Sequence, residues 1–359
     1  MARFTRTVAL RVRSIRTFAV AAAVIGVLAL GGCTTGAVPG FDGIEPEQTA
    51  AAAPPPPPSS PSSSPSSSPS PDPSPDETAP PTAVPTPPPC TATTMSVWAH
   101  PDDDLLFLQT VIGADIAAGN CVRTVFLTSG DAGRGADYSN GREAGLMRAY
   151  DVMRGASTPW AAQSVTLSTG AQTTVWQPAD DPRLSIVFFH LPDGNLYGQG
   201  YPATGELSLA KLAADKILTI PSVGGAYQLS WGQIVDSLRE LVGQFAPTTL
   251  HTHVPGSAQR WAKGDHADHA ITGILGRAAW QAAGLPESLV RYAVGYQTVE
   301  YPPNLAGPLL ESKIAAFRAY AAGDSVVIGC HDDASCLALP RFGDWLQREY
   351  TRTEAELWQ

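Results

Sequence analysis

Histidines and aspartates suited to metal binding gather in two short stretches of this 359-residue chain. The first is His100–Asp104 (His-Pro-Asp-Asp-Asp), and the second is His266–His269 (His-Ala-Asp-His). A histidine and an aspartate three residues apart can hold one divalent cation, which leaves another carboxylate free to move a proton. Taken alone, the first stretch could equally be the acidic start of the helix that follows it.

The second stretch favours the metal interpretation. The chain has seven histidines, and four of them lie at His251, His253, His266 and His269. The last two share one face of a predicted helix, and Asp268 between them could orient an imidazole through its second nitrogen. We expect the first two to be strand or rim residues, with a ligand role for His253 as the less favoured alternative.

Alternating strand-like and helix-like segments position both clusters. An apolar run, 95–99, precedes the first, and the strand 248–254 precedes the second. The other predicted strands are 121–128, 184–190 and 290–294, with a strand or hairpin over 164–176. The predicted helices are 104–118, 142–154, 231–245, 266–283 and 312–322. Such alternation predicts an α/β, Rossmann-like fold, with a mostly parallel sheet and helices on both faces. Ligand sites in such sheets lie beyond the carboxyl ends of the strands.

The N-terminal residues resemble a bacterial lipoprotein signal. Five arginines precede an apolar run, 18–30, which ends in small residues before Cys33. The resemblance implies that residues 1–32 are a lipoprotein signal peptide and that Cys33 is lipidated. A membrane-spanning anchor is the alternative, but the apolar run is short for one. We therefore expect an extracytoplasmic protein that is anchored to the bacterial cell membrane.

Residues 33–89 are predicted to be a disordered tether. Seventeen of the 33 prolines lie between Pro54 and Pro89, mixed mainly with serine, threonine and alanine. Few large apolar residues interrupt them, so no core can form there. Removal of residues 1–32 takes away five arginines and no acid, which changes the formal charge from -10 to -15. A chain this acidic is a poor partner for nucleic acid.

Residues 90–359 are predicted to form one folded domain, which contains four of the five cysteines. An even number of cysteines in an exported domain suggests disulfides. Of the three possible pairings we favour Cys90–Cys121, which would tie together the starts of two strands, and Cys330–Cys336, which closes a short loop. A cysteine-rich zinc site is the competing interpretation, although no CxxC spacing exists.

The two clusters together resemble the PIG-L/LmbE-type deacetylases, zinc-dependent enzymes that remove acetyl groups from N-acetylglucosamine-containing conjugates. The resemblance covers most of the chain from Met95 to Tyr320. Weaker landmarks are the Thr-Ser-Gly-Asp-Ala-Gly turn at 128–133, the Arg-Glu pair at 142–143 and the Pro-Asp-Gly loop at 192–194. By this resemblance one Zn²⁺ is bound by His100, Asp103 and His269, and Asp102 is the general base.

The resemblance also implies roles around the metal. His266 would stabilise the oxyanion and act as an acid, with Asp268 supporting it, while Arg142 and Asp193 would contact the sugar or its aglycone. Asp104 stands where the family often has Glu, and we interpret it as a helix-start charge. The stretch 160–176 and the tail 330–359 have no clear counterpart in the family.

These observations predict a zinc-dependent hydrolase of the N-acetyl amide of an amino sugar at the cell surface. Its partners would be the acetylated substrate and, through the lipid anchor, the membrane. The alternative is a non-catalytic surface lipoprotein that binds a metal or a glycan. Hydrolysis of a phosphoester is a third possibility, but two-metal phosphoesterases need more bridging carboxylates than this chain shows.

Overall fold

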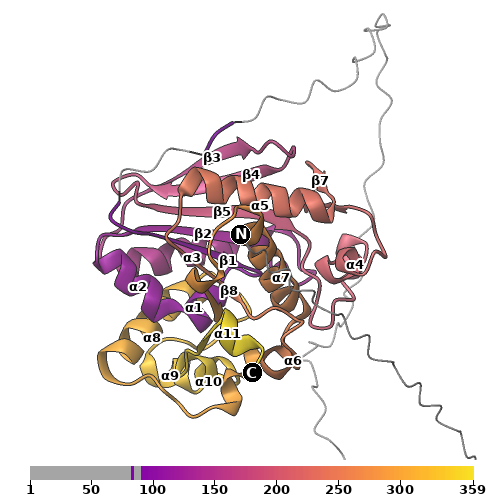
Figure 1. The fold of residues 1–359 in the computed structure, drawn as a ribbon. Helices are drawn as coiled ribbons and strands as arrows, with labels where there is room; N and C mark the ends of the chain where they lie inside the picture. The colour runs from indigo at the N-terminus through magenta and orange to yellow at the C-terminus, as the bar shows by residue number, and fades with distance from the viewer. Residues whose placement is uncertain (1–81, 85–89) are drawn as a thin grey trace, which may run out of the picture. The chain divides into compact units, whose positions relative to one another are not determined.

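The computed structural model describes residues 82–84 and 90–359. Its main feature is an eight-stranded sheet in the order β10-β9-β8-β1-β2-β5-β4-β3 (Figure 1). The strands are β1 (Thr93–Trp98), β2 (Cys121–Thr128), β3 (Trp160–Thr166), β4 (Gln172–Pro178), β5 (Leu184–Leu191), β8 (Thr249–His253), β9 (Val290–Ala293) and β10 (Thr351–Thr353). The five central strands, from β9 to β5, pair in parallel, and the other three are antiparallel. The predicted fold class is therefore confirmed.

Helices connect and flank these strands. They are α1 (Asp103–Phe107), α2 (Gln109–Ala117), α3 (Ala136–Arg154), α4 (Leu209–Ala213), α5 (Trp231–Phe245), α6 (Gln259–Ala262), α7 (Ala267–Ala282), α8 (Gly307–Ala321), α9 (Asp333–Leu337), α10 (Phe342–Leu346) and α11 (Glu354–Leu357). A two-stranded sheet pairs β6 (Ile220–Pro221) with β7 (Gln228–Leu229). No helix in the described ranges is both long and apolar enough to span a bilayer.

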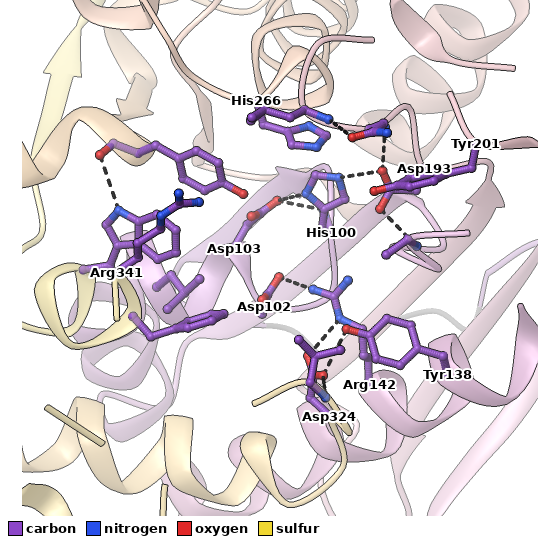
Figure 2. A pocket seen from close by; sticks show the side chains of 18 residues that line it. His100, Asp102, Asp103, Tyr138, Arg142, Asp193, Tyr201, His266, Asp324 and Arg341 are labelled. Atoms are coloured by element: carbon purple, nitrogen blue, oxygen red, sulfur yellow. Dashed lines mark hydrogen bonds and ion pairs between the residues drawn. The ribbon is translucent and has the colours of Figure 1, made fainter. Parts of the chain in front are cut away.

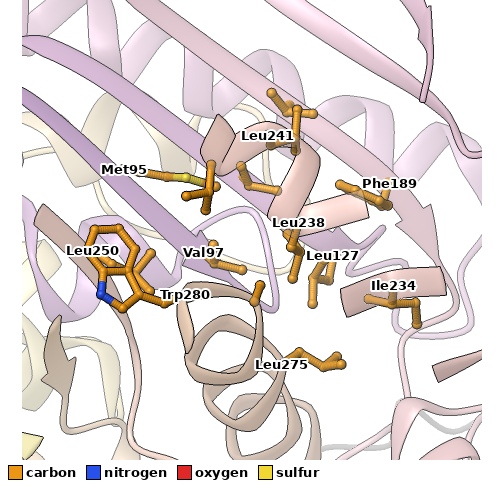
Figure 3. Packing of buried hydrophobic residues seen from close by; sticks show 14 of the residues in the cluster. Met95, Val97, Leu127, Phe189, Ile234, Leu238, Leu241, Leu250, Leu275 and Trp280 are labelled. Atoms are coloured by element: carbon orange, nitrogen blue, oxygen red, sulfur yellow. The ribbon is translucent and has the colours of Figure 1, made fainter. Parts of the chain in front are cut away.

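Alternate residues of the central strands build two cores. Met95 and Val97 of β1 face a core that contains Leu238 of α5 and Leu275 of α7 (Figure 3). Trp98, on the other face, joins a core formed with α1, α2, α3 and α8. Because both faces are covered, the parallel strands are nearly continuous apolar runs. The helices therefore lie on both faces, as expected.

Local sequence features explain the helix boundaries and one break. Ser230 caps α5 in a capping box with Gln233, and the apolar face of α5 matches the helical period. The helix expected over 104–118 is interrupted at Leu108, whose φ of −151° separates α1 from α2. The sequence pattern missed this break because apolar residues continue across it. The segment 164–176 forms the β3–β4 hairpin.

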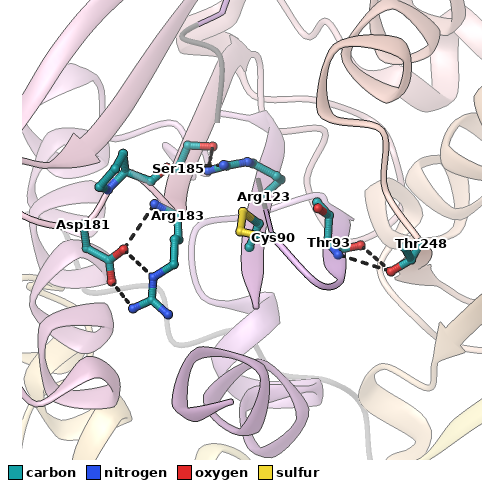
Figure 4. The surroundings of a disulfide bond; sticks show 9 residues. Cys90, Thr93, Arg123, Asp181, Arg183, Ser185 and Thr248 are labelled. Atoms are coloured by element: carbon teal, nitrogen blue, oxygen red, sulfur yellow. Dashed lines mark hydrogen bonds and ion pairs between the residues drawn. A yellow bond between two sulfur atoms is a disulfide. The ribbon is translucent and has the colours of Figure 1, made fainter. Parts of the chain in front are cut away.

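Both expected disulfides are present in the structure. Cys90 is bonded to Cys121 at the start of β2, close to the start of β1 (Figure 4). Cys330 is bonded to Cys336 at the start of the C-terminal segment. Residues 82–84 contact the domain as well, since the Val84 side chain is buried in the core beside α5 and its amide donates to Gln244. The predicted signal peptide, Cys33 and the rest of the tether lie outside the described residues.

Candidate functional site

A cavity of about 380 Å³ opens at the carboxyl ends of the parallel strands. It lies beside the point where the strand order reverses, because the chain runs outward from β1 through β2 and β5 and then returns to β8. Figure 2 shows its polar side chains pointing toward one another. Residues of both sequence clusters line it together with others from the domain: His100, Asp102, Asp103, Tyr138, Arg142, Asp193, Tyr201, His266, Tyr296, Asp324, Arg341, Phe342 and Trp345.

The three predicted metal ligands converge at this cavity. His100 follows β1, Asp103 begins α1, and His269 lies in the first turns of α7. The Nδ1 atom of His100 is 3.2 Å from Nε2 of His269 and 3.4 Å from Oδ2 of Asp103, and the same Nε2 is 3.0 Å from Asp103 Oδ1. A tetrahedral Zn²⁺ with bonds of about 2.0–2.1 Å has neighbouring ligand atoms about 3.3 Å apart. The donor types suit such a cation, and both oxygens of Asp103 lie within reach of it, while His100 and His269 also form a close group of donors with His266.

Carboxylates behind the ligand histidines complete the arrangement. Asp265 Oδ1 is 2.9 Å from His269 Nδ1, and Asp268 Oδ2 is 3.4 Å from His100 Nε2. Such carboxylate–histidine pairs fix the ring and its tautomer in metal sites. Sequence reasoning missed Asp265, although its position four residues before His269, just ahead of the N-cap of α7, was a usable signal. Asp265 can approach because residue 295 is glycine, where a Cβ would collide with the carboxylate.

The charge on His269 reflects these two acids. Burial lowers its pKa, but the carboxylates of Asp103 and Asp265 outweigh burial and raise the pKa to about 9. Without a cation the ring therefore holds a proton between two acids. A metal ligand must be the neutral imidazole, so a bound cation would take the place of that proton.

His253 lies closer to the centre than its predicted place on the rim. Its Nε2 is 3.0 Å from Asp103 Oδ2, and its ring stacks on His269 with centroids 4.1 Å apart. Burial lowers its pKa to about 4, so the ring is neutral. His253 with Asp103 and His269 is also a possible ligand group, but hydrogen bonding to the carboxylate of Asp103 is the contact that the structure shows.

Asp102, the predicted base, faces the cavity beside Arg142. The guanidinium donates to Asp102 Oδ1 at 2.5 Å, to the hydroxyl of Tyr320 at 2.7 Å and to the carbonyl of Gly130 at 2.6 Å. Burial raises the pKa of Asp102, Arg142 lowers it, and the outcome is about 6. Such a carboxyl can accept and return a proton near neutral pH. Arg142 lines the cavity, so its predicted contact with substrate stays a prediction, and the contacts that the structure shows hold the base.

His266 is neutral and has a defined tautomer. It caps α7, and its Nδ1 accepts a hydrogen bond from the backbone N–H of Asp268 at 3.1 Å. Burial, and then the neighbouring His100, lower its pKa to about 4. The ring proton is therefore on Nε2, which suits a donor to a developing oxyanion. The Asp268 carboxylate lies 3.9 Å from His266 Nδ1, farther than from His100, so its support of His266 comes mainly through the backbone.

The surroundings of Asp193 lower its pKa, whereas those of Asp104 raise its pKa. Asp193 lines the cavity and accepts hydrogen bonds from the amides of Asn195 and Ala132. Burial raises its pKa, but His100 and His266 outweigh burial and lower it, so Asp193 is ionised. Asp104 is completely buried and accepts from the hydroxyl of Tyr150, and burial raises its pKa to about 8. Asp104 does lie in the first turn of α1, as expected, but its side chain points into the core, where burial disfavours the charged form.

Comparisons with known proteins support the family that the two sequence clusters resemble. Residues 95–280 match the family model described as PIG-L, GlcNAc-PI de-N-acetylase. This segment contains every residue discussed above except those of the C-terminal part, such as Tyr296, Tyr320 and Trp345. A search among curated proteins finds no match.

Solved structures provide weaker likenesses. The zinc-inhibited form of the teicoplanin deacetylase Orf2 is 17% identical, with a TM-score of 0.36, over 66% of this chain and 86% of that chain. The N,N'-diacetylchitobiose deacetylase of Pyrococcus horikoshii is 12% identical, with a TM-score of 0.40, over 73% and 82%. GalB, the 4-carboxy-2-hydroxymuconate hydratase of Pseudomonas putida KT2440, is 14% identical, with a TM-score of 0.35, over 66% and 84%.

All three scores are low, so the assignment to a family depends on the match to the family model. That match spans more than half of the chain and includes both the His100–Asp104 and the His266–His269 clusters. The chain belongs to the PIG-L family.

Proposed function

We propose that the protein is a zinc-dependent deacetylase that hydrolyses the N-acetyl amide of an amino sugar. The observation that carries this proposal is the position of Asp102. Asp102 lines the cavity together with His100 and Asp103, which are in contact with the buried His269, and the pKa of Asp102, about 6, suits proton transfer. The family assignment supports the acetylated amino sugar as the substrate class.

The residues divide the chemistry among them. His100, Asp103 and His269 would hold the cation, which when bound would supply a Lewis acid for the carbonyl and for the attacking water. Asp102 takes one proton from that water as its oxygen attacks the amide carbon. His266 donates its Nε2–H to the oxygen that becomes negative. When the C–N bond breaks, Asp102 returns the proton to the nitrogen, so acetic acid and the free amine leave, and the acid ionises to acetate in water.

Substitution of Asp102 by asparagine tests this assignment. The amide keeps the size of the carboxyl but cannot accept the proton, so we expect the rate of acetate release to fall by at least about a hundredfold. Zinc content should stay near that of the wild type, because Asp102 is not a ligand. Acetate release from N,N'-diacetylchitobiose, together with metal analysis of the same samples, provides both measurements.

Asp137, an exposed residue at the start of α3, provides the matched control. Asp137→Asn should leave both measurements unchanged. Full activity in Asp102→Asn would show that another group is the base. If the wild-type protein binds zinc but releases no acetate from acetylated amino sugars, the non-catalytic binding function is favoured instead.

We also propose that the domain acts outside the cytoplasmic membrane, anchored by a lipid on Cys33. The sequence before Cys33 and the proline-rich segment after it support this location. In a bacterial host, Cys33→Ser should lose the label from a fatty-acid precursor and leave the membrane fraction, or accumulate as the uncleaved form. Retention of the cleaved variant in the membrane fraction would contradict lipid anchoring.

A further inference from the structure

We propose that Asp324 is a positioning residue for the base Asp102, on which it acts through Tyr320 and Arg142. This inference rests on the proposed function, in which Asp102 moves the proton. Asp324 and Tyr320 lie beyond the segment 95–280 that matches the family model, so that match assigns no role to them. The C-terminal part of the domain then completes the catalytic site.

The guanidinium of Arg142 lies between two carboxylates (Figure 2). Its Nη2 donates to Asp102 Oδ1 at 2.5 Å, and its Nε lies 3.5 Å from Asp324 Oδ2. The Tyr320 hydroxyl connects the two sides, because it accepts from Arg142 Nε at 2.7 Å and donates to the same Asp324 oxygen at 2.6 Å. The third nitrogen, Nη1, donates to the carbonyl of Gly130 at 2.6 Å. Each nitrogen of the guanidinium therefore has an acceptor in a fixed direction.

Other donors hold Asp324 in its place. Its Oδ1 accepts from the Tyr138 hydroxyl at 3.0 Å and from the backbone N–H of Val326 at 2.9 Å. Together with the Tyr320 hydroxyl, these groups supply three hydrogen bonds to a buried carboxylate. Such a satisfied buried network is rigid, so Asp324 can fix the groups that are bonded to it.

A close contact between α3 and the end of α8 brings Asp324 to Arg142. A Cβ at Gly145 would collide with the Tyr320 carbonyl, and a Cβ at Gly323 would collide with the backbone of α3. Arg142 lies three residues before Gly145 and therefore near the same face of α3. Tyr320 lies in the last turn of α8, and Asp324 follows the end of this helix. The backbone contact thus determines the distance between the guanidinium and its two C-terminal partners.

The Arg142 contact determines which way Asp102 faces. Asp102 stands at the N-cap position of α1, where an aspartate side chain usually accepts from a backbone N–H of the first turn. It makes no such hydrogen bond, and Arg142 holds its Oδ1 instead. Asp102 lines the cavity in this position. Once Arg142 is released, the carboxylate can turn back to the helix end, away from the attacking water.

The test is a double-mutant cycle on acetate release from N,N'-diacetylchitobiose. Asp324→Asn places an amide where the carboxylate meets Arg142 and Tyr320. We expect kcat to fall by about tenfold to a hundredfold, because a small misplacement of a reacting group costs up to about a hundredfold. The loss should be mainly in kcat, with zinc content unchanged. In the Asp102→Asn background, Asp324→Asn should cause no further loss, since the two residues act as a unit.

Tyr320→Phe provides a milder variant, because it keeps the ring and removes only the hydroxyl between Arg142 and Asp324. It should lower kcat by about twofold to tenfold, the fold-change that corresponds to one ordinary hydrogen bond, and again only when Asp102 is present. If Asp324→Asn does not fold, Tyr320→Phe in the two backgrounds decides the question in the same way.

Glu354→Gln is the matched control. The Glu354 carboxylate also accepts from a tyrosine hydroxyl, that of Tyr292 at 2.6 Å, and from an arginine, Arg277, at 2.6 Å. It is absent from the lining of the cavity, so kcat should stay near the wild-type value. An equal loss of kcat in Glu354→Gln would show that any disturbed carboxylate network lowers the rate, which would overturn the specific role of Asp324.

Two kinetic outcomes would also overturn the positioning role. One is a loss from Asp324→Asn that is as large without the base as with it, and the other is a raised KM with unchanged kcat, which would make Asp324 a substrate contact. If the wild-type protein releases no acetate, the proposed function fails on this substrate, and crystal structures then decide the inference by themselves. An Asp102 carboxylate that has left Arg142 in Asp324→Asn would support it, and an unchanged contact would contradict it.

Discussion

Replacement of His269 by alanine is expected to remove the bound metal and to lower acetate release by at least about a thousandfold, because Lewis-acid activation contributes several kcal/mol to the barrier. The Nε2 atom of His269 lies 3.2 Å from Nδ1 of His100 and 3.0 Å from Oδ1 of Asp103, so its loss leaves two ligands. Two ligands do not hold zinc in a structure of this kind. Metal content, measured after dialysis against a weak chelator, and the rate of acetate release test this expectation.

Two further variants show whether the loss of metal is specific to the removal of His269. Asp265→Asn keeps His269 but weakens the carboxylate behind it, so zinc affinity should fall by an intermediate amount, about tenfold to a hundredfold. His331→Ala, on an exposed loop, should change neither metal content nor rate. A His269→Ala protein that still contains one zinc per chain would remove this residue from the site and would favour His253 with Asp103 as the anchoring pair.

The sequence alone predicts the strands and the residues that gather at their carboxyl ends, because these features depend on local residue patterns. Apolar runs such as that before His100 identify buried parallel strands, and residues after their carboxyl ends must meet at one edge of the sheet. The convergence of His100, Asp103 and His269 follows from this rule, although they lie far apart in the sequence. Family resemblance added the roles, because spacing alone does not distinguish a base from a ligand.

The remaining features depend on contacts between segments that no local pattern relates. Arg142 lines the cavity, where the predicted contact with substrate stays a prediction, but its contact with Asp102 had no local signal. Asp104 lies at the start of α1, as expected, but no local pattern indicated that its side chain is buried against Tyr150. No local pattern relates the tail 330–359 to the site either, because its approach to α1 depends on buried contacts between distant segments, such as the Lys313 ammonium that joins Leu106 to Trp345 and the packing of Phe107 against Trp345.

Substitution of Lys313 by methionine is expected to cost about 3–5 kcal/mol of unfolding free energy, the usual cost of breaking a buried ion pair at one partner. The Lys313 side chain is completely buried, and burial lowers its pKa while Glu349 opposes this effect. Its ammonium lies 3.2 Å from Oε1 of Glu349 and donates to three backbone carbonyls. Methionine fits the space but removes the cationic partner of the buried Glu349 carboxylate, which keeps only Thr110 as a donor, and removes one donor from each of the three carbonyls. Urea unfolding followed by circular dichroism measures the change.

The same substitution should also weaken substrate binding, because Leu106 and Trp345, which Lys313 joins, both line the cavity. Because Lys313 joins Leu106 of α1 to Trp345 of α10, its loss should raise KM for amino-sugar substrates under conditions where the variant is still folded. Lys216→Met, at an exposed position, should change stability by less than about 0.5 kcal/mol. Glu349→Gln should cost less than Lys313→Met, since the ammonium keeps its three carbonyls. If Lys313→Met unfolds at the wild-type urea concentration, the ammonium does not hold α10 against α1, and the packing of Trp345 against Phe107 and Tyr296 is sufficient to fix it.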